Sequence, residues 1–145
     1  MKTVEQILKT KSQHQTVYTI GPDDSVLDAL KLLAEKNVGA LPVVENQQVV
    51  GIVSERDYAR KLVLKGRSSA ATPVREIMSA PVITVDPKKN LDYCMQQMTD
   101  RHLRHLPVVE HGKLLGLLSI GDLVKETIAE QANLIEQLQQ YIRGE

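Results

Sequence analysis

Hydrophobic and polar positions along the chain follow two periods, and each period predicts one kind of element. Runs of β-branched residues at Thr16–Ile20 and Val82–Val85 predict two short strands. Apolar residues three and four positions apart within 26–33 and 91–98 predict that an amphipathic helix follows each strand. The apolar stripes consist of Val26, Ala29, Leu30 and Leu33 in the first helix and of Leu91, Cys94, Met95 and Met98 in the second.

Two aliphatic runs joined by a polar turn follow each predicted helix. They read LPVVENQQVVGIVS at 41–54 and LPVVEHGKLLGLLS at 106–119, and runs joined so tightly predict hairpins. Their continuous apolar character predicts strands that are buried on both faces. A further helix is expected after Ser54 and after Ser119, so each half of the chain has the order β-α-β-β-α.

These two halves are an internal repeat. Residues 17–57 align with residues 82–122 without a gap, and the identical positions include Pro22 and Pro87 as well as the run LPVVE. An internal repeat of this length predicts two similar units. We therefore expect an α/β fold in which tandem β-α-β-β-α repeats face each other across a pseudo-twofold axis, with a C-terminal helix.

Helix-forming sequence also lies outside the repeats. A short helix is expected at Val4–Lys9, and another at Val74–Met78 within a link rich in Gly, Ser and Ala. Residues 123–143 predict a longer helix with one apolar side, which would dock on the body of the protein or on a second copy. The expected domains are a leader with a short helix (1–15), a first repeat (16–65), a linker (66–80), a second repeat (81–128) and a C-terminal helical extension (129–145).

Composition and charge narrow the function classes. The 18 Lys and Arg residues balance 18 Asp and Glu residues, so no net charge draws the chain to nucleic acid or anionic lipid. There is no Trp or Phe to stack on single-stranded bases. No apolar run approaches the roughly 20 residues of a membrane helix, and the N-terminus lacks the apolar core of a signal peptide. We expect a cytoplasmic protein whose partners include neither nucleic acid nor membrane.

The stretches GIVSERD (51–57) and GLLSIGD (116–122) each place Ser three residues before Asp, where a predicted strand meets a helix. This pattern is typical of a capping box, in which the Ser hydroxyl accepts a hydrogen bond from a backbone N–H of the first turn. Three features also favour a ligand: a Gly within each strand, Asp where a capping box prefers Glu or Gln, and a helix N-terminus, which favours a bound anion. The carboxylate can accept two hydrogen bonds from the diol of a ribose.

The Gly-x-x-Ser-x-x-Asp motif, preceded in the same unit by Leu-Pro-Val-Val, resembles the CBS domain, and two in tandem resemble a stand-alone, bacterial-type CBS pair, or Bateman module. The resemblance covers residues 16 to about 128. It implies a regulatory sensor that binds adenosine compounds in clefts between the repeats. The implied binding residues are Thr19, Ile20, Ala40, Leu41, Pro42, Ser54 and Asp57 in the first repeat, and Thr84, Val85, Leu106, Pro107, Ser119 and Asp122 in the second.

The two implied sites are not equal. Between Ser and Asp, Arg56 of the first repeat offers a fork of donors to a phosphate, whereas Gly121 of the second lets a ligand approach the backbone. Before the second Leu-Pro pair stand Arg104 and His105, and in the family basic residues at this place often reach nucleotide phosphates. We expect one cleft to take a charged nucleotide much better than the other.

AMP is the first ligand that we expect and NAD the second, with ADP, ATP and S-adenosylmethionine as further members of the class. AMP suits two phosphate-facing clefts, and NAD would place its AMP half in one of them. A ligand shifts a conformational equilibrium only by its differential affinity for two states. The sensor therefore needs an oligomer or a partner that prefers one state, and we expect a homodimer and an unidentified protein partner.

Rival functions find less support in the sequence. His102, His105 and His111 match no zinc spacing. Cys94 repeats the apolar position of Ala29, which suits a core residue rather than a nucleophile. We see no Ser-His-Asp, metal or paired-acid constellation, so we expect neither an enzyme nor a catalytic cofactor. The alternative function is an interaction or dimerisation module in which the Ser-x-x-Asp motifs only cap helices.

Overall fold

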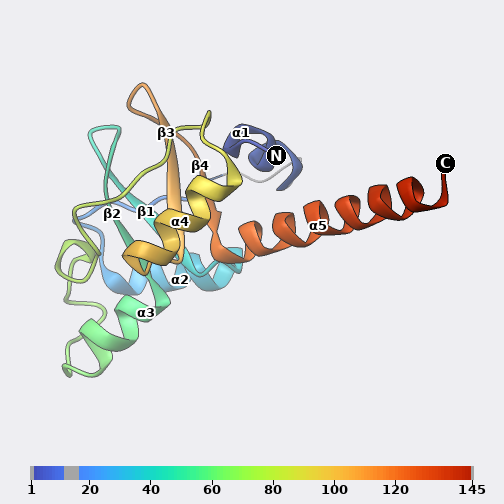
Figure 1. The fold of residues 1–145 in the computed structure, drawn as a ribbon. Coiled ribbons are helices and arrows are strands. Elements are labelled where there is room, and N and C mark those ends of the chain that lie inside the picture. The colour runs from blue at the N-terminus through green and yellow to red at the C-terminus, as the bar shows by residue number, and fades with distance from the viewer. Residues whose placement is uncertain (1, 12–16, 145) are drawn as a thin grey trace. The chain divides into compact units, whose positions relative to one another are not determined.

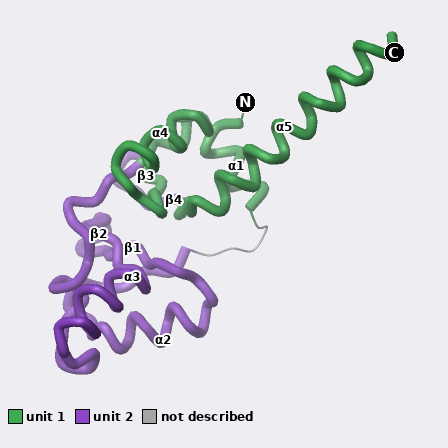
Figure 2. The backbone as a smooth tube through the Cα atoms, turned by 60° about the horizontal axis from the view of Figure 1, so that its bottom comes forward, with its two compact units in different colours: residues 1–15, 85–109, 116–145 green, residues 16–84, 110–115 purple. Residues whose placement is uncertain are grey.

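The computed structural model describes residues 2–11 and 17–144 (Figure 1). The chain forms two compact units, which Figure 2 shows in different colours. The first-repeat unit comprises residues 16–84 and 110–115, and the second-repeat unit comprises residues 1–15, 85–109 and 116–145. Each repeat combines helices with a two-stranded sheet. The α/β fold with two repeats and a C-terminal helix is therefore confirmed.

The first repeat is built from α2 (Val26–Lys36), β1 (Ala40–Glu45) and β2 (Gln48–Ser54). Helix α2 begins where the Ser25 hydroxyl accepts a hydrogen bond from the third helical N–H at 3.0 Å. It ends at Asn37, whose left-handed φ of 54° closes the helix. The apolar stripe of α2 packs against one face of the β1–β2 hairpin. The buried core contains Val26, Ala29, Leu33, Leu41, Val43, Val53, Leu62, Val74 and Ile77.

The second repeat uses α4 (Leu91–Arg101), β3 (His105–Glu110) and β4 (Lys113–Ser119) in the same way. The Asn90 side chain caps α4 by accepting from the third helical N–H at 2.9 Å, and His102 closes it with a φ of 56°. Both predicted helices are thus confirmed, although Leu30 and Met95 are only half-buried. The buried apolar residues of this unit include Val4, Ile7, Val85, Leu91, Cys94, Met98, Leu106, Val108, Leu118 and Leu123.

The predicted first strand of each repeat is wrong in extent. Within the described residues 17–20 and 82–85, only Ile20 and Val85 make a bridge, each parallel to the following strand. The Ile20 N–H donates to Pro42 O at 3.1 Å, and Val85 repeats this bond to Pro107 O at 2.9 Å. The next donor in each ladder would be a proline (22 and 87), which has no N–H, so the pairing ends there. Thr16 lies outside the described residues.

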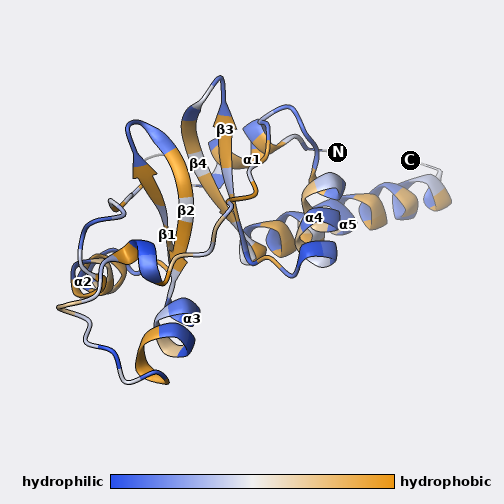
Figure 3. Cartoon of the chain, turned by 90° about the vertical axis from the view of Figure 1, so that its left-hand side faces the viewer, coloured by the Kyte–Doolittle hydropathy of each residue, from blue (hydrophilic) through white to orange (hydrophobic). Residues whose placement is uncertain are grey.

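Burial on both faces is confirmed for the start of the strands β1 and β3 and wrong for β2 and β4. Residues 40–43 and 106–108 are buried in succession, whereas in β2 and β4 buried residues alternate with half-exposed ones. A hairpin packed on one face explains the alternation. Figure 3 shows largely apolar strands that end in polar tips. Each tip is a two-residue turn with positive φ at both residues (46–47 and 111–112), as tight hairpins require.

Two leading segments are exchanged between the repeats. Helix α1 (Val4–Lys11) precedes the first repeat but packs in the second-repeat unit, where its first N–H donates to Lys89 O at 2.8 Å. The single 3-10 turn η2 (Val74–Glu76) precedes the second repeat but packs in the first-repeat unit, where its first N–H donates to Asp24 O at 2.8 Å. Lys89 and Asp24 are equivalent positions of the repeat, so the two segments play equivalent roles.

The final helices of the two repeats differ in length. In the first repeat α3 (Glu55–Asp57) continues as a π-helical segment, η1 (Tyr58–Val63). In the second repeat α5 (Ile120–Arg143) is one continuous helix that includes the predicted helical region 123–143. Among residues 2–11 and 17–144, no helix is long and apolar enough to cross a membrane.

Candidate functional site

The first Ser-x-x-Asp motif forms a complete capping box. The Asp57 N–H donates to Ser54 Oγ at 3.2 Å, and the Ser54 N–H donates to Asp57 Oδ2 at 3.0 Å. The Ser54 hydroxyl also donates to the same carboxylate oxygen at 3.0 Å. Aspartate therefore completes the reciprocal bond in place of the usual Glu or Gln. The cap interpretation of SERD is confirmed.

The other oxygen of Asp57 is also occupied. The Ser79 hydroxyl donates to Oδ1 at 3.1 Å, and Lys61 Nζ lies 3.1 Å from the same atom. Lys61 additionally donates to Ile77 O at 3.1 Å. Asp57 is only 8% exposed. Its carboxylate thus holds donors on both oxygens in a nearly buried place, which is how a buried charge is stabilised.

The second Ser-x-x-Asp motif forms the same cap with a different cation. The Ser119 N–H donates to Asp122 Oδ2 at 2.8 Å, and the Asp122 N–H donates to Ser119 Oγ at 3.1 Å. Lys11, the last residue of α1, places Nζ 2.8 Å from Asp122 Oδ2 and donates to Leu117 O at 2.7 Å. In the described part of the chain, Asp122 Oδ1 has no hydrogen-bond partner. This carboxylate is therefore less fully engaged than that of Asp57.

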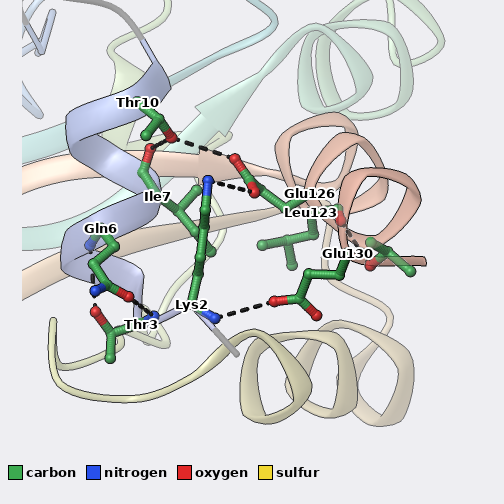
Figure 4. A network of polar contacts seen from close by, with 9 residues as sticks. Lys2, Thr3, Gln6, Ile7, Thr10, Leu123, Glu126 and Glu130 are labelled. Carbon is green, nitrogen blue, oxygen red and sulfur yellow. Dashed lines mark hydrogen bonds and ion pairs between the residues drawn. The ribbon is translucent and has the colours of Figure 1, made fainter. Parts of the chain in front are cut away.

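A reversed charge explains why the cations come from different places. The repeat position of Lys61 is occupied by Glu126 in α5, so no lysine follows Asp122 by one turn. Glu126 instead lies 3.1 Å from Lys2 Nζ and accepts from the Thr10 hydroxyl at 3.3 Å (Figure 4). These contacts fasten α1 to α5, and α1 then supplies Lys11 to Asp122.

We call the two capped motifs, Ser54–Asp57 and Ser119–Asp122, the first and second corners. Charged groups of the second corner act on His105. Burial lowers the pKa of His105, the charges of Lys11 and Arg104 lower it further, and Asp122 opposes them. The imidazole is therefore neutral at pH 7. Lys11, Arg104 and Asp122 therefore all contribute to the electrostatic environment of this ring. In the first repeat the equivalent of His105 is Ala40, which has no charge to offer.

At the start of α5, one backbone N–H lies between two others that are already hydrogen-bonded. The Ile120 N–H donates to Arg104 O at 2.9 Å, and the Asp122 N–H is used by the cap. For the Gly121 N–H between them, the residues 2–11 and 17–144 provide no acceptor. Gly121 itself is exposed. The predicted site residues Thr19, Arg56, Thr84 and Arg104 also have exposed side chains.

The residues predicted to wall an adenine are covered by the protein itself. Leu41 and Leu106 are completely buried core residues. The carbonyls of Pro42 and Pro107 accept from Ile20 and Val85 in the parallel bridges. Ala40 stands opposite Ser54 in the β1–β2 register. The side chains of both leucines are therefore not available at the surface, and the positions nearest the caps contribute mainly backbone.

The glycine within each second strand has a packing role. A Cβ on Gly51 would lie 2.7 Å from Met78 Sδ, and one on Gly116 would lie 2.7 Å from Leu8 Cδ2. Both neighbours belong to the exchanged leading segments, so each Gly admits a close approach of α1 or of the segment at η2. Among the three features that favoured a ligand, this one is explained by packing instead.

His102, His111 and Cys94 each have a structural place in the described part of the chain. His102 closes a helix, His111 lies in a hairpin turn, and both have positive φ. Nowhere in the described ranges do three or more His, Cys, Asp or Glu side chains gather in a group that could hold a metal ion. Cys94 is completely buried, and burial raises the pKa of its thiol to about 11. A thiol with this pKa is a poor nucleophile at neutral pH.

Lys11, Lys61 and Ser79 contact the two aspartates, and the sequence interpretation missed all three. A signal for two of them was present. VEQILK at 4–9 matches VREIMS at 74–79 in the pattern of apolar positions, but with a spacing of 70 rather than 65 residues. Aligning the leading segments separately would have placed Ser79 and the end of α1 next to the second strand of each repeat.

Comparison with known proteins gives the family. The CBS domain family matches residues 4–64 and 74–129. The CBS domain-containing protein CBSX3, mitochondrial, from Arabidopsis thaliana is 40% identical over 98% of this chain and 72% of its own length. A structure of a CBS-domain protein from Burkholderia ambifaria superposes with a TM-score of 0.85 at 56% identity, covering 90% of this chain and 96% of the other. The chain therefore belongs to the CBS domain family.

CBS domains are regulatory modules that bind adenosine ligands. CBSX2 has been solved in complex with AMP, and this chain is similar to it with a TM-score of 0.66 at 31% identity, over 81% of this chain and 92% of CBSX2. The two Ser-Asp corners described above, Ser54–Asp57 and Ser119–Asp122, are the polar caps that each of the two matched domains carries.

Proposed function

We propose that this protein is a non-catalytic sensor of adenine nucleotides, with AMP as its preferred ligand and NAD as the second. The proposal is supported by one observation above all: each repeat places a Ser hydroxyl and an Asp carboxylate at a helix start, in a chain whose family binds adenosine ligands. Asp57 and Asp122 would accept hydrogen bonds from the hydroxyls of a ribose. The AMP complex of CBSX2 favours AMP over the other adenosine compounds.

The second-repeat corner is proposed to be the tighter site. Asp122 has an oxygen to offer to a ribose, Lys11 brings positive charge to it, and the charge of Arg104 acts on the neighbouring His105. The N-terminal end of the long helix α5 carries a partial positive charge, which adds a further preference for an anion. At the first corner a ribose would have to displace Ser79 or Lys61 from Asp57. The unequal affinity expected from sequence thus gains a structural rationale.

A bound nucleotide would act by shifting an equilibrium between two states of an oligomer or of a complex with a protein partner. Each nucleotide would favour the state to which it binds more tightly. This role requires neither a catalytic residue nor a catalytic cofactor, and we place the protein in the cytoplasm as part of the same proposal.

A thermal melt with AMP, ADP, ATP, NAD, S-adenosylmethionine and GMP tests the proposal. At a hundred times its dissociation constant a ligand adds about 2.7 kcal/mol to the free energy of unfolding. For a chain of this size this raises Tm by roughly 5 to 11 °C. We expect a rise with AMP, a smaller one with NAD and none with GMP. Asp122→Ala should remove most of the AMP effect and Asp57→Ala little of it. No shift with any adenosine compound at millimolar concentration would refute the proposed function.

A second function, homodimerisation, is favoured by the exposed apolar stripe of α5. Ile128, Ile135 and Ile142 recur at intervals of seven residues and are 62%, 56% and 80% exposed, and Leu138 lies between the last two at 53%. Figure 3 shows apolar segments alternating with polar ones along α5. A seven-residue apolar repeat suits pairing with another helix of the same repeat, so we propose the α5 of a second copy as the occupant.

Light scattering coupled to gel filtration tests the dimer. The wild-type chain should elute with the mass of a dimer. Ile135→Asp places a charge in the stripe and should give a monomer, whereas Gln137→Asp, on the other side of the helix, should leave the dimer intact. A monomeric wild-type chain would contradict pairing through α5 and leave the nucleotide proposal standing.

A further inference from the structure

We propose that Lys11 gives the second-repeat corner its preference for phosphorylated nucleosides, because its ammonium moves from Asp122 to the phosphate when such a ligand binds. This inference rests on the proposed function, since it names the residue that reads the phosphate at that same site. It assigns to α1, a segment outside the Ser-x-x-Asp motifs, a direct part in recognition.

Lys11 alone donates to a strand carbonyl and to the aspartate, whereas in the first repeat two groups of Ser79 make the equivalent contacts. There the backbone N–H of Ser79 donates to Ile52 O at 2.8 Å, and the Ser79 hydroxyl donates to Asp57. At the second corner one ammonium serves both equivalents, Leu117 O at 2.7 Å and Asp122 Oδ2 at 2.8 Å. A flexible four-carbon side chain can leave these acceptors without disturbing the backbone, which the N–H of a bridged strand cannot do.

The charges at this corner are unbalanced in favour of an anion. Lys11 and Arg104 carry two positive charges near His105, Asp122 carries one negative charge, and the imidazole is neutral at pH 7. One positive charge is therefore left over. A nucleoside monophosphate would neutralise it, whereas an uncharged nucleoside would not.

Ribose and ammonium compete for the same carboxylate. A diol that donates one hydrogen bond to each oxygen of Asp122 meets Lys11 and the Ser119 N–H, which both already contact Oδ2. Ribose binding therefore weakens the ion pair and makes the ammonium available to a phosphate on the same ligand. The stem of Lys11 is fixed nearby, because Lys2 and Thr10 fasten α1 to Glu126 (Figure 4).

The first corner supplies a matched control. Lys61 also contacts its aspartate, at 3.1 Å, but it follows Asp57 by one helical turn and donates to Ile77 O. The residues equivalent to Arg104 and His105 are Gly39 and Ala40, so no second basic group stands beside it. Removing the Lys61 ammonium should leave phosphate recognition at the second corner unchanged.

Calorimetric titration of the full chain with AMP and with adenosine tests the proposal in three proteins: wild type, Lys11→Met and Lys61→Met. We expect Lys11→Met to weaken AMP binding by about tenfold to a hundredfold, the range for one hydrogen bond to a charged group. Adenosine affinity should stay the same or increase, because a competitor for Asp122 is gone. Lys11→Arg should keep the preference for AMP, and Lys61→Met should keep it as well.

The outcomes separate the two proposals. If wild type binds neither AMP nor adenosine, the proposed function falls and this inference with it. If wild type binds AMP but Lys11→Met keeps the same ratio of AMP to adenosine affinity, only the inference is overturned. An equal loss of both ligands would also overturn it and leave Lys11 with a purely structural role.

A measurement on wild type covers the case in which Lys11→Met does not fold. Acetylation of lysines by an N-hydroxysuccinimide ester, followed by mass spectrometry, reports how accessible each ammonium is. Adenosine should increase the acetylation rate of Lys11 by freeing it from Asp122, and AMP should lower the rate below that with adenosine. The same rate with both ligands would contradict the proposal.

Discussion

The two Ser-x-x-Asp corners of this protein have the same motif, the same cap and different surroundings. At the first corner Ser54, Lys61 and Ser79, all from the first-repeat unit, contact Asp57, and both carboxylate oxygens are used. At the second corner the cation is Lys11, which precedes both repeats in the sequence and contacts only one oxygen of Asp122. One reversed charge, Lys61 in the first repeat and Glu126 in the second, is part of this difference.

This difference shows how a duplicated motif can divide its tasks. A carboxylate with all its acceptor positions satisfied stabilises the fold and has little left for a ligand. A carboxylate that shares one ion pair with a lysine through a single oxygen keeps acceptor capacity and positive charge close together. The first corner therefore suits a structural role, and the second suits recognition.

The largest expected effect is on the free energy of unfolding when each carboxylate is removed from the unliganded protein. Asp57→Ala removes a cap and leaves Lys61 and Ser79 without their acceptor, so we expect a loss of about 3 kcal/mol in the free energy of unfolding. Asp122→Ala removes a cap and a carboxylate that accepts from fewer groups than Asp57 does, and should cost about 1 to 2 kcal/mol. Urea unfolding followed by circular dichroism measures both.

Asp92, an exposed acid in the first turn of α4, serves as the control. Asp92→Ala should change the free energy of unfolding by no more than about 0.5 kcal/mol. Equal costs for Asp57→Ala and Asp122→Ala would show that the two corners are energetically the same, against the contrast drawn from their contacts.

The next effect concerns the glycines beneath the two leading segments. A Cβ on Gly51 would meet Met78 Sδ at 2.7 Å and the backbone carbonyl of Ser79 at 3.0 Å, whereas the three atoms nearest to a Cβ on Gly116 would all belong to the Leu8 side chain. A backbone carbonyl held in a bridge cannot move aside, but a leucine can change its rotamer. We expect Gly51→Ala to cost about 2 to 3 kcal/mol and Gly116→Ala about 1 kcal/mol.

Thermal and urea unfolding of both variants check this order. Adding Leu8→Ala to Gly116→Ala should relieve the contact, so the double variant should lose less than the sum of the single losses. Adding Met78→Ala to Gly51→Ala should relieve it less, because the carbonyl remains. The reverse order of the two single variants would contradict the close approach seen in the first-repeat unit.

The smallest effect is a pH dependence that belongs to the second corner alone. Burial, Lys11 and Arg104 hold the pKa of His105 below 6.5 in the folded chain, so the unfolded chain binds the proton more readily. This contribution to stability is present above pH 6.5 and is lost as pH falls through the folded pKa. His105→Gln should flatten the rise of stability between pH 5.5 and 7.5.

Urea midpoints at several pH values measure this slope, and an NMR titration of His105 measures its pKa directly. Lys11→Met should move that pKa upward, because a nearby positive charge has been removed. A pKa that stays the same in Lys11→Met would place the ammonium too far from the ring to matter.

Much of the fold could be predicted because it is local. The helical period predicted α2 and α4, and the paired aliphatic runs predicted both hairpins. The Ser-x-x-Asp motifs predicted both capping boxes. The first strands were wrong in extent, because only Ile20 and Val85 pair with the following strand, and Pro22 and Pro87 prevent the pairing from continuing beyond them. The leading segments failed because their spacing differs from that of the repeats.

The sequence by itself determined the duplication, the order of elements in each repeat and the two Ser-Asp caps, since these depend on periodicity and on contacts within a few residues. Only the tertiary structure decided which cation meets which aspartate. Lys11 reaches Asp122 across 111 positions of sequence because α1 packs on the second repeat, and no local pattern encodes such a contact. The physical reason is that packing of Leu8 over Gly116 and the ion pair of Glu126 with Lys2 fix α1 there.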